Sequence, residues 1–208
     1  MREITAIKPK RRGRRVSVFL DGEFAFGLSL GVAEGSHLYT GQALTQSQIE
    51  ELKSADQLHT CLNAAMRYLS YRPRSEREVR MRLRLRGFDD KAIEDAILQL
   101  RGKGLIDDVA FAHFWKEERE SFSPRGKLLL KLELKGKGVE PEIAEGIVSG
   151  IDEEEGAYRA ARKKATTLRE GDYYAFRQKL GSFLRRRGFS YEVIERTVER
   201  MWMETPLP

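Results

Sequence analysis

The sequence has little of the chemistry that stabilises secreted, metal-binding or membrane proteins. Its 208 residues include one cysteine, Cys61, and three histidines. One cysteine cannot form an internal disulfide, and three scattered histidines add too few ligands for a structural zinc site. No run of about 18 apolar residues could span a membrane, and no apolar signal core follows the charges of the N-terminus. We therefore expect a cytoplasmic protein that does not contact membranes and holds no metal.

The sequence also lacks the motifs of nucleotide binding and catalysis. The phosphate-binding pattern G-x-x-x-x-G-K-S/T is absent, and no histidine lies in a recognisable motif with a nucleophile and an acid. The acidic pair Asp107-Asp108 could serve a metal-dependent nuclease. However, it follows Gly104 and precedes an apolar helix, where an N-cap residue is expected. The sequence thus predicts that the protein is not an enzyme and uses no cofactor.

Charge, by contrast, is abundant and unevenly placed. The chain has 38 Lys and Arg against 32 Asp and Glu, a net charge of +6. Four windows hold 24 of these cations and only three acids: residues 8–15, 67–86, 125–137 and 177–187. Such separation favours basic patches that face a polyanion or an acidic protein. Solvated helix faces are the alternative explanation for any single window.

An internal repeat accounts for most of the chain. Three segments, LRLRGFDDKAIEDAI, LKGKGVEPEIAEGIV and LRRRGFSYEVIERTV, align on Gly87, Gly138 and Gly188. Their regular spacing is typical of stacked supersecondary units. A leucine stands four residues before each glycine and an apolar residue directly after it, which predicts a helix that ends in a Schellman motif. A second helix then follows each glycine, and a further helix precedes the pair.

The repeat predicts three-helix units at residues 56–106, 107–156 and 157–205. A unit of about 50 residues has a marginal core, so neighbouring units would stack on one another. Residues 1–55 differ and are expected to form a small β-rich cap. The predicted fold class is mainly α, with three tandem three-helix repeats in an elongated, curved array behind an N-terminal β-hairpin segment.

The cap is predicted from two local signals. Asp21-Gly22 lies between alternating apolar and polar runs, which indicates a type I′ hairpin. Strand alternation across that turn predicts Phe19, Phe24 and Phe26 on one face. Thr45 and Gln48 are then placed for a capping box that opens a helix through Leu52.

The cations near the repeat glycines are the candidate binding residues. A base stands three residues and one residue before each glycine, and the helix dipole favours such cations by about 0.3–1 kcal/mol. The dipole does not explain Arg77, Arg80 and Arg84, which share one side of a helix. Equivalent helix faces of stacked repeats would align these cations. The candidate set, called the basic stripe, comprises Arg72, Arg74, Arg77, Arg80, Arg84, Lys127, Lys131, Lys135, Arg185, Arg186 and Arg187.

At this level of detail the chain resembles the RecX family, regulators of the RecA recombinase. The similarity lies in YLSYRPRSEREVRMRLRLRGF (68–88), GLIDDVAFAHFWKEER (104–119) and FLRRRGFSYEVI (183–194), and it runs from about residue 57 to 203. The middle repeat departs from the pattern at Gly136, which should weaken that helix end by up to about 1 kcal/mol relative to alanine.

The resemblance implies a negative modulator that docks in the groove of the RecA–single-stranded-DNA filament. Such a protein would inhibit ATP hydrolysis, strand exchange and co-protease function, and so regulate DNA repair and recombination. The implied partners are the RecA filament and single-stranded DNA, with duplex DNA as a further possibility, and the protein is expected to be a monomer. A stand-alone nucleic-acid-binding helical-repeat protein is the alternative, and a pure protein scaffold is a third hypothesis.

Overall fold

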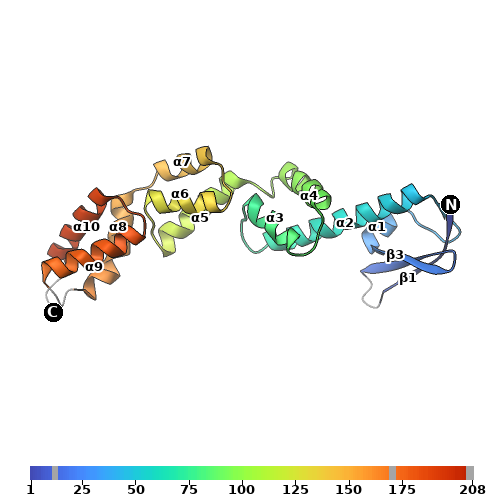
Figure 1. The fold of residues 1–208 in the computed structure, drawn as a ribbon, viewed down its shortest axis with the longest axis horizontal. Coiled ribbons are helices and arrows are strands. Elements are labelled where there is room, and N and C mark those ends of the chain that lie inside the picture. Colours follow the sequence, from blue (N-terminus) through green and yellow to red (C-terminus); the bar gives the residue numbers. More distant parts are fainter. Residues whose placement is uncertain (11–13, 169–171, 205–208) are drawn as a thin grey trace. The chain divides into compact units, whose positions relative to one another are not determined.

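The computed structural model describes residues 1–10, 14–168 and 172–204, which fold as two compact units. The first unit holds residues 1–72 and 78–106, and the second holds residues 73–77 together with the chain from Asp107 onward. The fold is mainly α-helical, with one small sheet near the N-terminus (Figure 1). The predicted fold class is confirmed in these terms. None of the described helices is long and apolar enough to cross a membrane.

The first unit combines a four-stranded antiparallel sheet with four helices. Its elements are β1 (Arg2–Pro9), β2 (Arg15–Leu20), β3 (Glu23–Ser29), α1 (Leu30–Gly35), β4 (Ala43–Leu44), α2 (Gln46–Leu69), α3 (Glu76–Arg84) and α4 (Asp90–Gly102), and the first two residues of α3 belong to the second unit. The strand order is β3-β2-β1-β4. The predicted hairpin is confirmed, because Asp21 and Gly22 both have positive φ, 53° and 87°, between β2 and β3.

The placement of the three phenylalanines on one face of this hairpin was wrong. Phe26 is buried with Val18 and Leu20, whereas Phe24 is 58% exposed and stacks edge-on against Phe19. The register shifts between Val18 and Phe19. This irregularity of the ladder accompanies the change of face, as is usual for a β-bulge.

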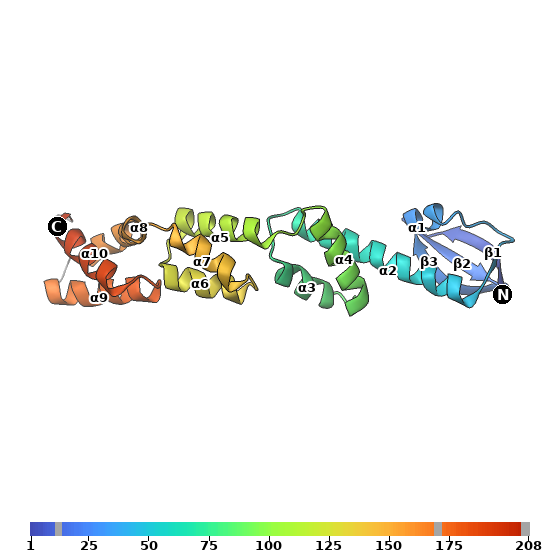
Figure 2. The ribbon, with the colours of Figure 1, turned by 90° about the horizontal axis from the view of Figure 1, so that it is seen from above.

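One continuous helix, α2, serves both the sheet and the first repeat (Figure 2). It begins at the predicted capping box of Thr45 and Gln48, but it continues past Leu52 to Leu69. Its N-terminal part packs on the sheet core through Ile49 and Leu52, and its C-terminal part packs on α3 and α4 through buried side chains such as Cys61.

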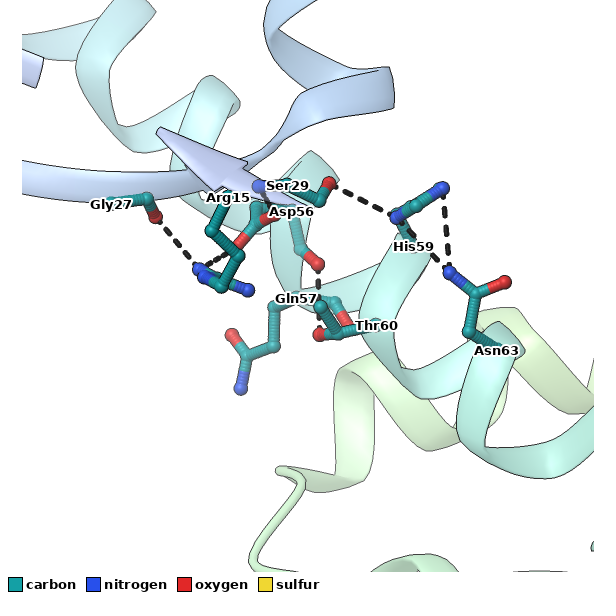
Figure 3. A network of polar contacts seen from close by, with 8 residues as sticks. All are labelled: Arg15, Gly27, Ser29, Asp56, Gln57, His59, Thr60 and Asn63. Atoms are coloured by element: carbon teal, nitrogen blue, oxygen red, sulfur yellow. Dashed lines mark hydrogen bonds and ion pairs between the residues drawn. The ribbon is translucent and has the colours of Figure 1, made fainter. Parts of the chain in front are cut away.

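A buried carboxylate fixes α2 to the sheet (Figure 3). Asp56, only 7% exposed, accepts hydrogen bonds from the Arg15 guanidinium at 2.7 Å and from the Ser29 backbone N–H at 2.5 Å. The Ser29 hydroxyl in turn lies 3.0 Å from Nδ1 of His59, one turn further along α2. Because both carboxylate oxygens have a partner, these hydrogen bonds offset the cost of burying the charge, and they give the packing of α2 on the sheet a direction.

The second unit is helical throughout its described part. Its elements are α5 (Asp108–Phe122), α6 (Lys127–Gly136), α7 (Pro141–Ser149), α8 (Glu153–Thr166), α9 (Tyr173–Arg186) and α10 (Tyr191–Glu204). The helices α5–α7 enclose one core around Phe111 and Leu134, and α8–α10 enclose another around Phe176 and Leu184.

The middle helix of each repeat ends as its glycine predicts. Gly87, Gly138 and Gly188 have φ of 81°, 86° and 80°. The backbone N–H of the apolar residue that follows each glycine donates to the carbonyl of the leucine five residues earlier, at 3.4, 3.1 and 3.4 Å. This is the six-to-one bond of the Schellman motif.

Within the second unit, the N-terminus of a middle helix is hydrogen-bonded to the glycine turn of the following repeat at two places, which we call joints: α3 to the turn at Gly138, and α6 to the turn at Gly188. Ser75, fully buried, donates its hydroxyl to the Lys137 carbonyl at 2.7 Å, and the Gly126 N–H donates to the Arg187 carbonyl at 2.9 Å. The next backbone N–H groups, of Glu76 and Lys127, donate to carboxylates in the first turn of the following repeat's first helix. These acceptors are Asp108 at 2.9 Å and Glu153 at 2.7 Å. The orphan N–H groups of one helix are thus satisfied by its neighbour.

We predict opposite effects for two glycine-to-alanine substitutions in α6 and its cap. A Cβ on Gly126 would lie 2.0 Å from the carbonyl oxygen of Gly188, whereas a Cβ on Gly136 would meet nothing within 4 Å. Gly126→Ala should lower the free energy of unfolding by about 1–3 kcal/mol or more, through overpacking. Gly136→Ala should raise it by up to about 1 kcal/mol, through helix propensity. Urea unfolding followed by circular dichroism measures both free energies of unfolding. Equal changes in the two variants would contradict the close contact between Gly126 and the turn at Gly188.

Candidate nucleic-acid interface

The groups that could suggest catalysis have structural roles. Asp107 caps α5 and accepts from the backbone N–H groups of Val109 and Ala110 at 2.8 and 3.0 Å. Cys61 is fully buried, and burial raises the pKa of its thiol to about 11, so it stays protonated and unreactive at neutral pH. Across the described ranges, no cluster of three or more His, Cys, Asp or Glu side chains could hold a metal ion.

Two cations of the basic stripe lie in a repeated ion pair between the middle and last helices of a repeat. The Arg80 guanidinium contacts the Glu94 carboxylate at 2.5 and 2.9 Å, and Lys131 pairs with Glu145. Arg80 and Lys131 each stand seven residues before a repeat glycine, and each glutamate stands seven residues after it. The third repeat has the equivalent Glu195, which pairs with Arg177 at 2.6 Å. These cations contribute to helix–helix packing within each repeat.

Four further members of the set have intramolecular partners. Arg72 forms a two-pronged pair with Glu78, at 3.1 and 3.4 Å. Arg84 contacts Asp90 at 3.1 Å, although both side chains are more than half exposed. The Lys127 ammonium donates to the Ser149 carbonyl at 3.3 Å.

Arg187 is the most enclosed of the four. Its guanidinium donates to the Ser123 hydroxyl and the Pro124 carbonyl, both at 3.3 Å, and lies 4.6 Å from the centre of the Phe183 ring. Burial, with a smaller effect from the nearby charge of Arg125, lowers the pKa of Arg187. Arg187 therefore belongs to the joint between the second and third repeats. Arg74, the member that precedes Ser75, is half-buried.

Four members remain open to solvent: Arg77, Lys135, Arg185 and Arg186 are exposed and form no ion pair among the described residues. The Arg77 stem packs over Gly138, where an added Cβ would lie 2.7 Å from that of Arg77. Lys135 and Arg185 stand three residues before their glycines, as Arg84 does before Gly87. We call Arg84, Lys135 and Arg185 the helix-end cations, because they recur at one place in the last turn of each middle helix.

Trp115 binds charged side chains inside the second repeat, a role that no sequence motif indicated. Its indole N–H donates to Glu133 at 2.9 Å, and the cations of Arg119 and Lys137 lie 4.6 and 4.7 Å from its ring centre. Lys137, one residue before Gly138, is thereby occupied inside the repeat. In the sequence, the cation one residue before each glycine looks the same as the cation three residues before it. Nothing in the sequence therefore indicated that Lys137 would contact Trp115 inside the repeat.

The fold and its helix ends define a tandem three-helix-repeat protein with exposed cations at equivalent helix termini. Comparison with known proteins agrees with this class. The model for the first three-helix domain of RecX matches residues 61–100, and the model for the third matches residues 152–198. The regulatory protein RecX of Clostridium botulinum is 31% identical over 96% of both chains, and that of Bacillus licheniformis is 31% identical over 91% of this chain and 73% of its own.

Solved structures support the same assignment over the whole described fold. A crystal structure of regulatory protein RecX matches with a TM-score of 0.72 and 25% identity, covering 96% of this chain and all of the other. RecX from Lactobacillus salivarius matches with a TM-score of 0.63 and 28% identity over 72% of this chain. The chain belongs to the RecX family. The resemblance drawn from the sequence is confirmed.

The Arg80–Glu94 pair generates a prediction about titration. The hydrogen bond from Arg80 is the largest of the effects that lower the pKa of Glu94 below its ordinary value. A carboxylate with a lowered folded pKa contributes stability above its unfolded pKa and loses that contribution as pH falls through the folded pKa. Arg80→Ala should therefore raise the pKa of Glu94, measured by NMR titration of its carboxyl carbon. Arg82→Ala, two residues further along α3 and not paired with Glu94, is the matched control. An unchanged Glu94 pKa in Arg80→Ala would contradict the pair in solution.

Proposed function

We propose that this protein negatively modulates a RecA-type recombinase by docking in the groove of the recombinase–single-stranded-DNA filament. The observation that carries the proposal is the recurrence of exposed cations at one place in each repeat, in a chain of the RecX family. Docked there, the protein inhibits ATP hydrolysis, strand exchange and co-protease function, and so regulates repair and recombination in the cytoplasm. Its role is electrostatic docking, without chemistry of its own.

The internal contacts divide the basic stripe into two groups. Arg80 and Lys131 are paired across their repeats, and Arg187 is enclosed in a joint. Their charges are partly neutralised before any partner arrives. Docking therefore falls mainly to Arg77, Lys135, Arg185 and Arg186, which form no ion pair among the described residues, and to Arg84, which stays mostly exposed in its pair with Asp90.

Exposed cations of this kind suit both surfaces of a nucleoprotein filament. They can neutralise phosphates, which releases counterions and makes binding dependent on salt, or face acidic protein surface. Each contact is weak alone, but contacts repeated along one chain add through effective concentration. A monomer is sufficient for this arrangement, since the repeats supply the multiplicity within one chain.

The first test is the DNA-dependent ATPase of RecA, with substoichiometric protein added to preformed filaments. We expect hydrolysis to fall. Unchanged hydrolysis at every ratio would remove the proposal.

We predict that Lys135→Glu combined with Arg185→Glu raises the concentration needed for half-inhibition by at least about tenfold. The matched control is Lys163→Glu combined with Lys164→Glu, in the last turn of α8, where both lysines are exposed and form no ion pair among the described residues. Both double variants change the net charge equally and suffer the same unfavourable helix-dipole effect. Equal loss of inhibition in the two would show that net charge, and not the helix-end position, governs docking.

The alternative function, a stand-alone nucleic-acid-binding protein, is favoured by one local observation. Tyr174 and Tyr191 are exposed beside Arg185, and aromatic rings among cations suit unpaired bases. Tight binding to bare single-stranded DNA without any effect on recombinase activity would favour this alternative.

A further inference from the structure

The third repeat has a pocket between α9 and α10, and Arg185 and two tyrosines lie around it. The pocket measures about 220 Å³. Its lining includes Tyr174, Gln178, Gly181 and Arg185 of α9 and Tyr191 and Ile194 of α10, and the ion-paired side chains of Arg177 and Glu195 form a further part of the wall. The α9 residues follow helical spacing and so lie on one face.

A glycine opens this pocket at the position that a long cation fills in the other repeats. Gly181 stands seven residues before Gly188, as Arg80 and Lys131 stand before their own glycines. A Cβ added to Gly181 would lie 3.6 Å from Ile194, so the side chain of Ile194 forms the adjoining wall.

The third repeat nevertheless keeps the ion pair of the other two. Glu195 is bound by Arg177, which reaches it from one turn earlier on α9, at 2.6 and 3.2 Å. The packing role of the pair is thus retained from a different position. Only the space that the paired cation occupies in the other repeats is left open, at Gly181 and beside Arg185, which has no ion-pair partner among the described residues.

Two exposed tyrosines stand beside the opened space. Tyr174 is 73% exposed and Tyr191 is 71% exposed. The aligned positions in the other repeats hold no aromatic residue: they are Pro73 and Pro124 for Tyr174, and Asp90 and Pro141 for Tyr191. Tyr174 lies in an additional N-terminal turn, since α9 has 14 residues where α6 has 10.

We infer that this pocket accepts an unpaired base of single-stranded DNA. Tyr174 or Tyr191 would stack on the base, Arg185 would contact the adjacent phosphate, and Gln178 would offer an amide to the base edge. The pocket is smaller than the roughly 300–1,000 Å³ that is typical of sites for whole small ligands, which suits one unit of a polymer. The choice of DNA as the source of the base rests on the proposed function. That the pocket suits a base and a phosphate rests on its lining residues alone.

The test is fluorescence anisotropy of a labelled single-stranded dT oligonucleotide with the full chain at low salt, without recombinase. Tyr174→Ala or Tyr191→Ala should weaken binding by about tenfold, and the corresponding Phe variants should bind as the unsubstituted protein does. Tyr39→Ala, at another exposed tyrosine, is the control and should have no effect.

Gly181→Lys separates the pocket from simple electrostatics, because it adds a positive charge while filling the space. The matched control is Gly146→Lys, where an added Cβ would meet nothing within 4 Å. We expect Gly181→Lys to weaken binding and Gly146→Lys to leave it unchanged or slightly tighter. Circular dichroism checks that both variants fold, and the tyrosine variants carry the test if Gly181→Lys does not.

Three results would overturn the inference: no binding of the oligonucleotide by the unsubstituted protein, less than twofold loss in both Tyr→Ala variants, or tighter binding by a folded Gly181→Lys. A matched rU oligonucleotide distinguishes the source of the base, and preference for it would overturn the assignment to DNA. If the oligonucleotide test contradicts the pocket, the protein can still inhibit the recombinase ATPase, so the proposed function stands. If the unsubstituted protein binds the oligonucleotide but does not inhibit the ATPase, the result counts against the proposed function and not against the pocket.

Discussion

The glycine turn at the end of each middle helix is the constraint on which the repeats depend. Only a residue without Cβ adopts the positive φ at Gly138 and Gly188 without strain and leaves room for the chain packed directly over it. The closeness matters because the carbonyl of the residue before the glycine also accepts a hydrogen bond from the N-terminus of the middle helix in the preceding repeat. One backbone conformation thus ends a helix, begins the following helix and holds a neighbouring helix by hydrogen bonds.

Local chemistry made much of this architecture predictable. A leucine, a glycine and an apolar residue at fixed spacing predicted the helix ends, and Asp107 and Thr45 were recognised as caps from their positions alone. The continuity of α2 was missed although no glycine or proline lies between Leu52 and Leu69. Its apolar face changes partner from the sheet to the first repeat, with buried Asp56 between the two contacts, so its hydrophobic pattern resembled two helices and not one.

The candidate site was less predictable, because the cations look alike in the sequence and differ only in what faces them. Arg80 and Arg84 are four residues apart on one helix, yet the side chain of Arg80 is 22% exposed in its pair with Glu94, whereas that of Arg84 is 61% exposed in its pair with Asp90. Both partners lie on α4, and helical spacing within α3 carries no information about how deeply each pair is buried. A signal did exist: a glutamate stands seven residues after all three repeat glycines, which marks a partner for the cation seven residues before two of them.

The differences among the repeats follow from the joints. The N-termini of α3 and α6 lie against a glycine turn, so the residues there, Ser75 and Gly126, must be small and an added turn would have no room. In the described part of the chain α9 has no such contact at its N-terminus, where Asp172 provides an ordinary N-cap to Ala175. The constraint is therefore relaxed in the third repeat alone. The additional turn with Tyr174 lies there, and so does the exchange of a paired cation for Gly181. A repeat architecture can acquire a distinct surface at low cost where its stacking contact is absent, because change there disturbs no neighbour.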